Sequence, residues 1–319
     1  MIKAPLLGGK IVAAVDAIEV FQSYCRGCEA CCVRRVTIKN KDGEDGEVDQ
    51  FYHRVIVLAL MGEDFPLPLA VWPIRPGEDE VVPALELIRQ VHHRFGPRFF
   101  DVLVADAIYG QAPFAHAIRE LGLGLIFTLK ANQPGLLGEA IQFTKDRPPD
   151  RFIDEKQNEK IFLWDEKDVL WDAARCSVRV VRSRRDRTLR ERRSHVTRDE
   201  PSKRSFTKSW DLREESRENY FVALLDHPAS AQGIYRAGKS RWDIDASLFQ
   251  DLTDNWGLKH MRAHRPVAVL AMILVLLIAY ALFNFYAYRQ VLSHIRKAKP
   301  TLIAIATHLA ETVRARGPP

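Results

Sequence analysis

Two aspartates follow short hydrophobic segments of the kind that form buried strands. The segment from Ile11 to Val15 leads into Asp16, and the segment from Phe100 to Ala105 leads into Asp106. Such short apolar segments are typical of strands covered on both faces in an α/β sheet, whose working crevice lies at the carboxyl ends of its strands. Two carboxylates placed there repel each other unless a cation lies between them. The pattern therefore predicts a metal-dependent enzyme.

A third acidic residue lies beside a basic one in the last third of the chain. Residues 229–260 are predicted to be mostly helical, with an apolar stripe at helical spacing that Asp245 flanks. Arg241 precedes Asp245 by one helical turn and lies on the same side. The arginine could contact a phosphate, or it could form an i,i+4 ion pair with Asp245 worth only about 0.3–0.5 kcal/mol.

The elements that must position these residues alternate along the chain. Helices are predicted around residues 83–91 and 113–121, the first opened by Pro83, which suits a first helical turn. Residues 73–80 are predicted to be a loop, and residues 131–135 a turn. Strands are predicted at 11–15, 32–38, 52–61, 100–105, 123–130 and 219–225.

Residues 145–215 differ from the rest in being dominated by charge. A partly alternating, β-branched segment begins at Cys176 and predicts a strand. A dense group of arginines follows, and it includes Arg184, Arg185, Arg192 and Arg193. This region is interpreted as an inserted, partly β element. Its arginines indicate either a solvated hairpin or a surface for DNA phosphates, and the second is favoured by the other features.

The overall charge is compatible with an acidic partner. The 319-residue chain has a formal net charge of +6, which favours nucleic acid but also suits a merely soluble protein. The beginning of the chain lacks the long apolar segment of a secretory signal, so a cytoplasmic location is expected. Residues 267–283 are apolar throughout and long enough to span a membrane. A helix buried within a large domain is the alternative.

Four of the five cysteines are crowded together, at Cys25, Cys28, Cys31 and Cys32. In a chain without a secretory signal, such crowding indicates reduced thiols. A structural zinc site usually has four ligands in two pairs from separate segments, and the sequence has no second cysteine pair, although His53 could approach the cluster. Free buried thiols are the favoured interpretation, and zinc binding is the alternative.

Several blocks together resemble the catalytic part of insertion-sequence DDE transposases, the bacterial group with a β-rich insertion in an RNase H-like fold. Asp16 with Phe21, Ser23, Cys28, Cys31 and Arg34 is similar to the first-aspartate block, and Val104 to Tyr109 to the second. Tyr52-His53-Arg54, the segment from Arg75 to Glu80 and the segment from Leu129 to Asn132 resemble further family blocks. The segment from Arg241 to Asp245 lies where the family has an arginine, a tryptophan and the third acid.

The resemblance implies a fold and an activity. The expected fold is an RNase H-like mixed sheet flanked by helices, in three parts: 1–144, the basic β-rich insertion 145–215, and 216–319, which ends in an apolar helix packed on the domain. The expected activity is cleavage and strand transfer of DNA, with Asp16, Asp106 and Asp245 holding two Mg²⁺ ions that Mn²⁺ can replace. Arg241, Lys130 and the four arginines of the insertion are expected to contact DNA.

The resemblance also implies partners for the protein, and the sequence differs from the family pattern at a few positions. The expected partners are transposon ends and target DNA, with a homodimer in the synaptic complex and no membrane. The third acid is aspartate where the family mostly has glutamate, and the family's tyrosine and lysine positions hold Gly238 and Leu252. The sheet begins almost at Met1, which predicts a truncated copy. The alternatives are an inactive remnant that binds DNA non-specifically and, less favoured, a membrane protein.

Overall fold

The computed structural model describes residues 7–39, 43–62, 64–154, 159–200, 203–260, 265–292 and 300–316, without the side chains of 190–211 and 313. The chain forms two compact units. The first comprises Met1–Asp101 and Ser240–Pro319, and the second comprises Val102–Lys239. Each unit contains strands and helices.

The first unit is built on four antiparallel strands. They are β1 (Val12–Ser23), β2 (Cys32–Lys39), β3 (Asp45–Leu60) and β4 (Leu67–Ile74), and β3 pairs with the other three. The segment from Val55 to Ala59 is buried throughout, because it is covered on both faces. This continuous burial explains why its sequence is uniformly apolar instead of alternating.

Asp16 lies inside a strand, so the prediction that the strand ends there is wrong. β1 continues to Ser23, and Asp16 pairs with Val57 of β3. The burial of β1 changes at this residue, from four buried positions before it to four partly exposed positions from Asp16 to Glu19, and burial returns at Val20 and Phe21. The continuous buried segment is interrupted at Asp16 because the surroundings change there, while the backbone ladder goes on.

Helices complete the first unit. They are α1 (Val81–Phe95), the π-helical segment η3 (Ile244–Phe249), α5 (Gln250–Asp254), α6 (Pro266–Tyr286), the π-helical η4 (Ala287–Leu292) and α7 (Leu302–Arg316). α1 packs against β3 and β4, and α6 packs against β4. The loop predicted at residues 73–80 begins inside β4, a strand that the sequence pattern missed.

The apolar helix is buried on one face only. Among the described residues, one helical stretch, Pro266–Leu292, is long and apolar enough to cross a membrane. Of its most apolar 18-residue part, 28% is buried inside the protein. On its packed side, Phe65 contacts the rings of Tyr280 and Phe285. Val275, Ile278 and Leu282 are exposed. The helix thus packs on its unit, as the resemblance implies, but it is not enclosed on all sides.

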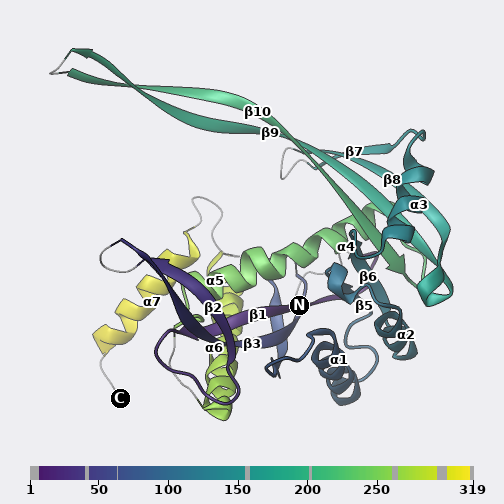
Figure 1. Ribbon diagram of the computed structural model, residues 1–319, viewed down its shortest axis with the longest axis horizontal. Helices are drawn as coiled ribbons and strands as arrows, with labels where there is room; N and C mark the ends of the chain where they lie inside the picture. The colour runs from purple at the N-terminus through teal and green to yellow at the C-terminus, as the bar shows by residue number, and fades with distance from the viewer. Residues whose placement is uncertain are drawn as a thin grey trace. The chain divides into compact units, whose positions relative to one another are not determined.

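The second unit contains a mixed sheet. Its strands follow the order β5 (Val102–Ala105), β6 (Gly124–Leu129), β10 (Lys203–Leu224), β9 (Cys176–Glu200), β8 (Glu159–Trp171) and β7 (Asp150–Asp154). β5 and β6 are parallel, and the other pairs are antiparallel. β9 and β10 form the long hairpin in Figure 1. Helical segments lie at η1 (Ala107–Tyr109), α2 (Ala112–Glu120), α3 (Pro134–Thr144), η2 (Asp172–Ala174) and α4 (Ala231–Asp243), which continues past the boundary between the units.

The predicted fold class is confirmed. The chain is a mixed α/β protein whose strands are flanked by helices, and β7, β8, β9 and most of β10 fall within the β-rich segment expected at 145–215. The strand expected at 219–225 is the end of β10, which begins much earlier. The three-part boundaries given above stay a prediction.

Candidate active site

Two of the three predicted acids meet at one guanidinium group. Arg241 Nη1 donates to Asp16 Oδ2 at 2.6 Å and to Asp245 Oδ2 at 3.0 Å. The arginine side chain is only 6% exposed, whereas that of Asp245 is 46% exposed. The i,i+4 ion pair left open above is therefore present, and a second carboxylate shares it. Residues 225 positions apart in the chain are joined in this way.

The Asp16 carboxylate lies in surroundings that disfavour its charge. Burial, together with the nearby Asp245 carboxylate, raises the pKa of Asp16 from 3.8 to about 7, although Arg241 and the backbone N–H of Ala17 act against the rise. Glu80 adds a smaller repulsion. A carboxylate in this position gains more from an added cation than an exposed one does, because the cation offsets both the burial and the repulsion.

Asp245 lies on an irregular turn of helix. It is the second residue of η3, a π-helical segment that directly follows α4. π-Helical turns are rare and are frequent at functional sites. Ile244 and Leu248 on the same segment are buried, so the wide turn keeps its apolar side packed while Asp245 faces outward. Arg241 also lies 5.3 Å from the ring of Trp242, as a cation over an aromatic face.

Asp106 belongs to the second unit and comes directly after β5, as predicted. Lys130 Nζ lies 3.0 Å from Asp106 Oδ1 and 3.2 Å from Oδ2. Two side chains of the turn after β6 donate hydrogen bonds to the backbone of the loop that begins at Asp106. Asn132 Nδ2 donates to the carbonyl of Ala107 at 2.6 Å, and Gln133 Nε2 donates to that of Gly110 at 2.8 Å. Asn132, which ends the segment from Leu129 that resembles a family block, thus helps to position the loop that begins at Asp106. The convergence of Asp106 with Asp16 and Asp245 stays a prediction.

The arginines predicted to contact DNA have partners within the protein where their side chains are described. Arg184 lies over the ring of Phe162 at 4.5 Å and pairs with Asp186 at 3.4 Å. Arg185 lies 3.6 Å from Glu159, a buried carboxylate. The side chains of Arg192 and Arg193 lie outside the described part. The described arginines are thus placed on a strand, and their contact with DNA stays a prediction.

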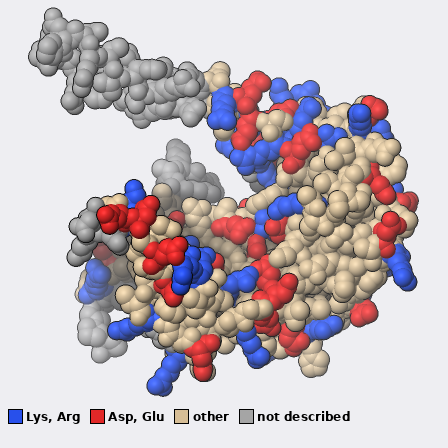
Figure 2. All heavy atoms as spheres, in the orientation of Figure 1, with Lys and Arg blue, Asp and Glu red and all other residues tan. Residues whose placement is uncertain are grey.

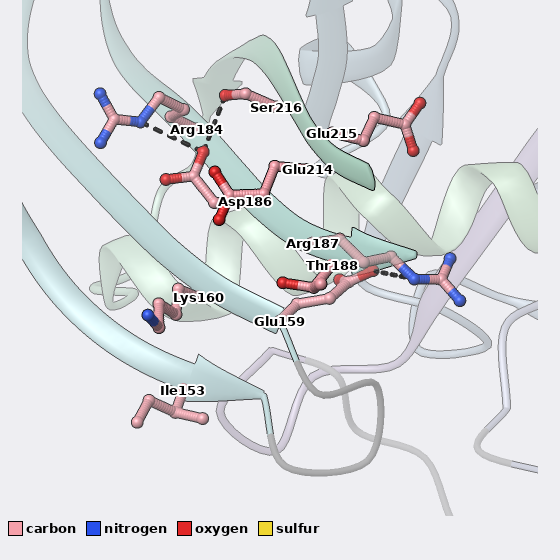
Figure 3. Close-up of a pocket in the computed structure, with 10 residues that line it drawn as sticks. All are labelled: Ile153, Glu159, Lys160, Arg184, Asp186, Arg187, Thr188, Glu214, Glu215 and Ser216. Atoms are coloured by element: carbon pink, nitrogen blue, oxygen red, sulfur yellow. Dashed lines mark hydrogen bonds and ion pairs between the residues drawn. The ribbon is translucent and has the colours of Figure 1, made fainter. Parts of the chain in front are cut away.

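A hollow of about 550 Å³ lies on the second unit beside these arginines. Figure 3 shows Arg184 and Ser216 both directed at Asp186, and Arg187 directed at Glu159. Acidic and basic side chains line this hollow together, including Glu214 and Glu215. Its mixed lining does not single out one sign of charge for a ligand, and Asp106 does not belong to it.

Sequence reasoning missed the buried Glu159. This residue is 1% exposed and lies near three cations, with Lys239 Nζ at 3.2 Å, Arg185 Nη1 at 3.6 Å and Arg187 Nε at 4.0 Å. Its signal in the sequence was weak, because one glutamate in a charged segment looks like a surface residue. Zinc binding at the cysteines was the less favoured alternative in the sequence, and the structure brings Cys28, Cys31 and His53 together.

Comparison with known proteins adds an independent finding. A family model described as the transposase DDE domain matches residues 50–282, a range that includes Asp106 and Asp245 and begins after Asp16. Among solved structures, the piggyBac transposase synaptic complex with hairpin DNA, studied by cryo-EM, is similar with 13% sequence identity and a TM-score of 0.45. That match covers 93% of this chain and 51% of the other, so this chain spans about half the length of that transposase. No protein with a curated description matches. Since the family model covers most of the chain, the protein belongs to the transposase DDE domain family.

Proposed function

We propose that this chain is the catalytic part of a DNA transposase that cleaves DNA and transfers strands with the help of divalent metal ions. The observation that carries the proposal is the shared contact of Asp16 and Asp245 with Arg241, in a chain of the DDE domain family. Asp106, which follows β5, is the third acid of the proposed set. An RNase H-like arrangement of the catalytic strands is part of the proposal.

The donor set fits hard divalent cations. Carboxylate oxygens are the ligands that Mg²⁺ prefers, and the raised pKa of Asp16 marks a group that a nearby cation would stabilise in its charged form. Two Mg²⁺ ions, or Mn²⁺ in their place, would when bound activate the attacking oxygen and stabilise the leaving oxygen of an in-line displacement on phosphorus. Asp16 would hold both ions, and Asp106 and Asp245 would hold one each.

The basic residues near the acids have separate proposed roles. Arg241 holds Asp16 and Asp245 in place through one buried guanidinium, so we assign it to positioning as well as to the phosphate contact expected from the sequence. Lys130 is 57% exposed beside Asp106 and is available to a DNA phosphate. DNA ends, target DNA, a homodimer in the synaptic complex and a cytoplasmic location complete the proposal.

One observation favours the second candidate, an inactive remnant that binds DNA. The Arg241 guanidinium lies between two of the carboxylates that would hold metal, and its charge competes with a cation for them. Asp245 is also one methylene shorter than the glutamate usual in the family. A misplacement of about 1 Å can cost on the order of 100-fold in rate.

Nicking of a supercoiled plasmid tests the proposal. Nicking is expected to require Mg²⁺ or Mn²⁺, and to be lost in Asp16→Asn, Asp106→Asn and Asp245→Ala, because each removes a metal ligand. Asp245→Glu is expected to keep or raise it. Asp254→Asn, an exposed carboxylate on the adjacent helix, is the matched control and should nick like the wild type. Equal nicking by the wild type, Asp245→Ala and Asp245→Glu would remove Asp245 from the mechanism. If none of these proteins nicks DNA but all bind it, the remnant is the better description.

A further inference from the structure

We propose that Cys28, Cys31 and His53 form a binding site for a divalent cation of the zinc type, chemically distinct from the carboxylates. Their ligand atoms all lie within 4.8 Å of one another. Cys31 and His53 are buried, and Cys28 is partly buried. Two sulfurs and an imidazole nitrogen are ligands that suit zinc and do not suit Mg²⁺.

The separations of the three ligand atoms match a tetrahedral ion. The sulfurs of Cys28 and Cys31 are 3.5 Å apart, and His53 Nε2 lies 3.6 Å from the first and 3.3 Å from the second. An ion bonded at about 2.3 Å to sulfur and about 2.0 Å to nitrogen would hold two sulfurs about 3.8 Å apart and a sulfur–nitrogen pair about 3.5 Å apart. The three side chains therefore need to move by only a few tenths of an ångström to share one.

The local backbone folds to bring the two cysteines together. The N–H of Cys31 donates to the carbonyl of Cys28 at 3.1 Å, and the N–H of Cys28 donates to the sulfur of Cys31 at 3.2 Å. The second of these bonds places one N–H donor against the Cys31 sulfur, and such a donor supports the thiolate form that binds metal. A β-carbon at Gly27 would lie 2.5 Å from the ring of Phe51, so this turn lies closely against β3, the strand that carries His53.

The backbone before the turn departs from regular strand geometry. β1 is irregular between Val20 and Ser23, where Phe21 adopts a left-handed backbone conformation with φ of 51°. That conformation is costly for a bulky residue, by about 1–3 kcal/mol, and Phe21 is fully buried. The irregularity lets the chain leave β1 and cross to β3 before β2 begins at Cys32. A bound ion would therefore link the β1–β2 connection to β3, which is a structural role.

The fourth coordination position is left to water or to Cys25. Cys25 lies three residues before Cys28 and is exposed, and its N–H donates to Ser23 Oγ at 3.2 Å. Cys32 lies outside the group of converging ligand atoms. The site thus has three fixed ligands and one position that solvent can reach.

Metal content and cobalt spectroscopy test the site. The reduced chain, freed of metal by a chelator and dialysed, should take up one Zn²⁺ or Co²⁺ per chain. Bound Co²⁺ should show the intense visible absorption of tetrahedral coordination and a thiolate charge-transfer band. This readout uses the wild type and does not depend on whether a variant folds. No uptake, or a cobalt spectrum of octahedral oxygen coordination only, would overturn the proposal.

Variants separate this site from the carboxylates. Cys28→Ser, Cys31→Ser and His53→Gln should each lower zinc affinity at least 10-fold and remove the charge-transfer band or weaken it. Cys32→Ser and Cys176→Ser are matched controls that remove a thiol outside the group, and Asp16→Asn removes a proposed Mg²⁺ ligand. All three should bind like the wild type. Equal binding by Cys28→Ser, Cys31→Ser and the wild type would overturn the proposal.

Discussion

At the scale of single residues, Arg241 determines what the two nearest acids can do. Its buried guanidinium holds Asp16 and Asp245 together, yet the pKa of Asp16 still rises to about 7 because burial outweighs that attraction. A group with these properties is easily deprotonated near neutral pH and strongly favours an added cation. Asp16 therefore makes the stability of the protein depend on pH and on bound metal.

Asp16→Asn is expected to change how stability depends on pH. Because the native pKa is raised, the folded chain binds more protons than the unfolded chain between about pH 4 and pH 7, so this group lowers the free energy of unfolding as pH rises through that range. The loss is at most about 4 kcal/mol, from about three pKa units at 1.36 kcal/mol each. The asparagine variant should lack this decline when urea unfolding is measured from pH 4 to 8 with a chelator present. Asp254→Asn should follow the wild-type curve, and a parallel curve for Asp16→Asn would contradict the raised pKa.

At the scale of elements, close contacts between helices and strands fix α4. Gly238 lies against the ring of Phe221 on β10, and a β-carbon at Gly238 would be 2.3 Å from that ring. The glycine that occupies the family's tyrosine position is thus explained by packing. Glu159 on β8 adds a second link, because it contacts Arg185 on β9 and Lys239 on α4.

Gly238→Ala is expected to destabilise the protein by about 1–2 kcal/mol. Alanine is favoured over glycine in a helix by about 1 kcal/mol, but the clash with Phe221 should outweigh that gain, since overpacking typically costs about 1–3 kcal/mol. Gly138→Ala in α3 is the matched control, because a β-carbon there meets nothing within 4 Å. That control should stabilise the protein by up to about 1 kcal/mol. Thermal unfolding of the three proteins measures both effects, and a gain in both variants would show that the contact is not tight.

Glu159→Gln is expected to destabilise the second unit by roughly 3 kcal/mol. The substitution keeps the shape of the side chain but removes the buried negative charge that compensates three partly exposed cations. Glu218→Gln removes an acid that pairs with Arg182 and is 41% exposed, so its cost should stay below about 1 kcal/mol. Urea unfolding gives both values. Similar losses for the two variants would show that Glu159 behaves as a surface residue.

At the scale of the whole molecule, charge is mixed instead of gathered. On the face shown in Figure 2, Lys and Arg alternate with Asp and Glu over the described surface. Many arginines of the second unit form ion pairs, as Arg179 does with Asp165 and Arg182 with Glu218. This pairing leaves the formal net charge of +6 unchanged, but these arginines already have an acidic partner within the protein.

DNA binding is expected to weaken steeply with salt, at a log–log slope of about −0.9 for each phosphate contact. Replacing Arg184, Arg185, Arg192 and Arg193 with glutamine should flatten that slope without altering sequence preference, because phosphate contacts do not read sequence. The control replaces four exposed arginines of other segments: Arg89, Arg94, Arg98 and Arg119. Filter binding from low to high salt measures each slope. An unchanged slope in the first variant would show that its arginines serve ion pairs within the protein.

The sequence predicted the fold class and the positions of most elements, because buried strands and amphipathic helices carry strong periodic patterns. It placed Asp106 correctly at the end of a strand, where the apolar pattern and the ladder stop together. It misplaced the end of β1, because at Asp16 the burial changes while the hydrogen-bonded ladder continues. β4 was missed, since its Pro68 and Pro73 are residues that usually argue against a strand.

The contacts within the site were predictable only in part. The pairing of Arg241 with Asp245 follows from helical spacing, but its contact with Asp16 depends on packing between distant segments. The π-helical turn has no sequence signature of its own. The role of His53 beside the cysteines depends on the irregular end of β1, which local patterns do not encode.

The position of Asp16 inside β1 has a consequence for conformational entropy. A carboxylate on a loop loses backbone freedom when it binds a ligand, at about 1–2 kcal/mol for each residue that becomes ordered. The backbone of Asp16 is already fixed by its pairing with Val57 and by the buried residues before it, so folding has met that cost in advance. Only its two side-chain torsions remain to be restricted, and Arg241 already limits them. Whatever binds to Asp16 therefore meets a preorganised oxygen donor, and its affinity is set by charge and solvation more than by ordering of the chain.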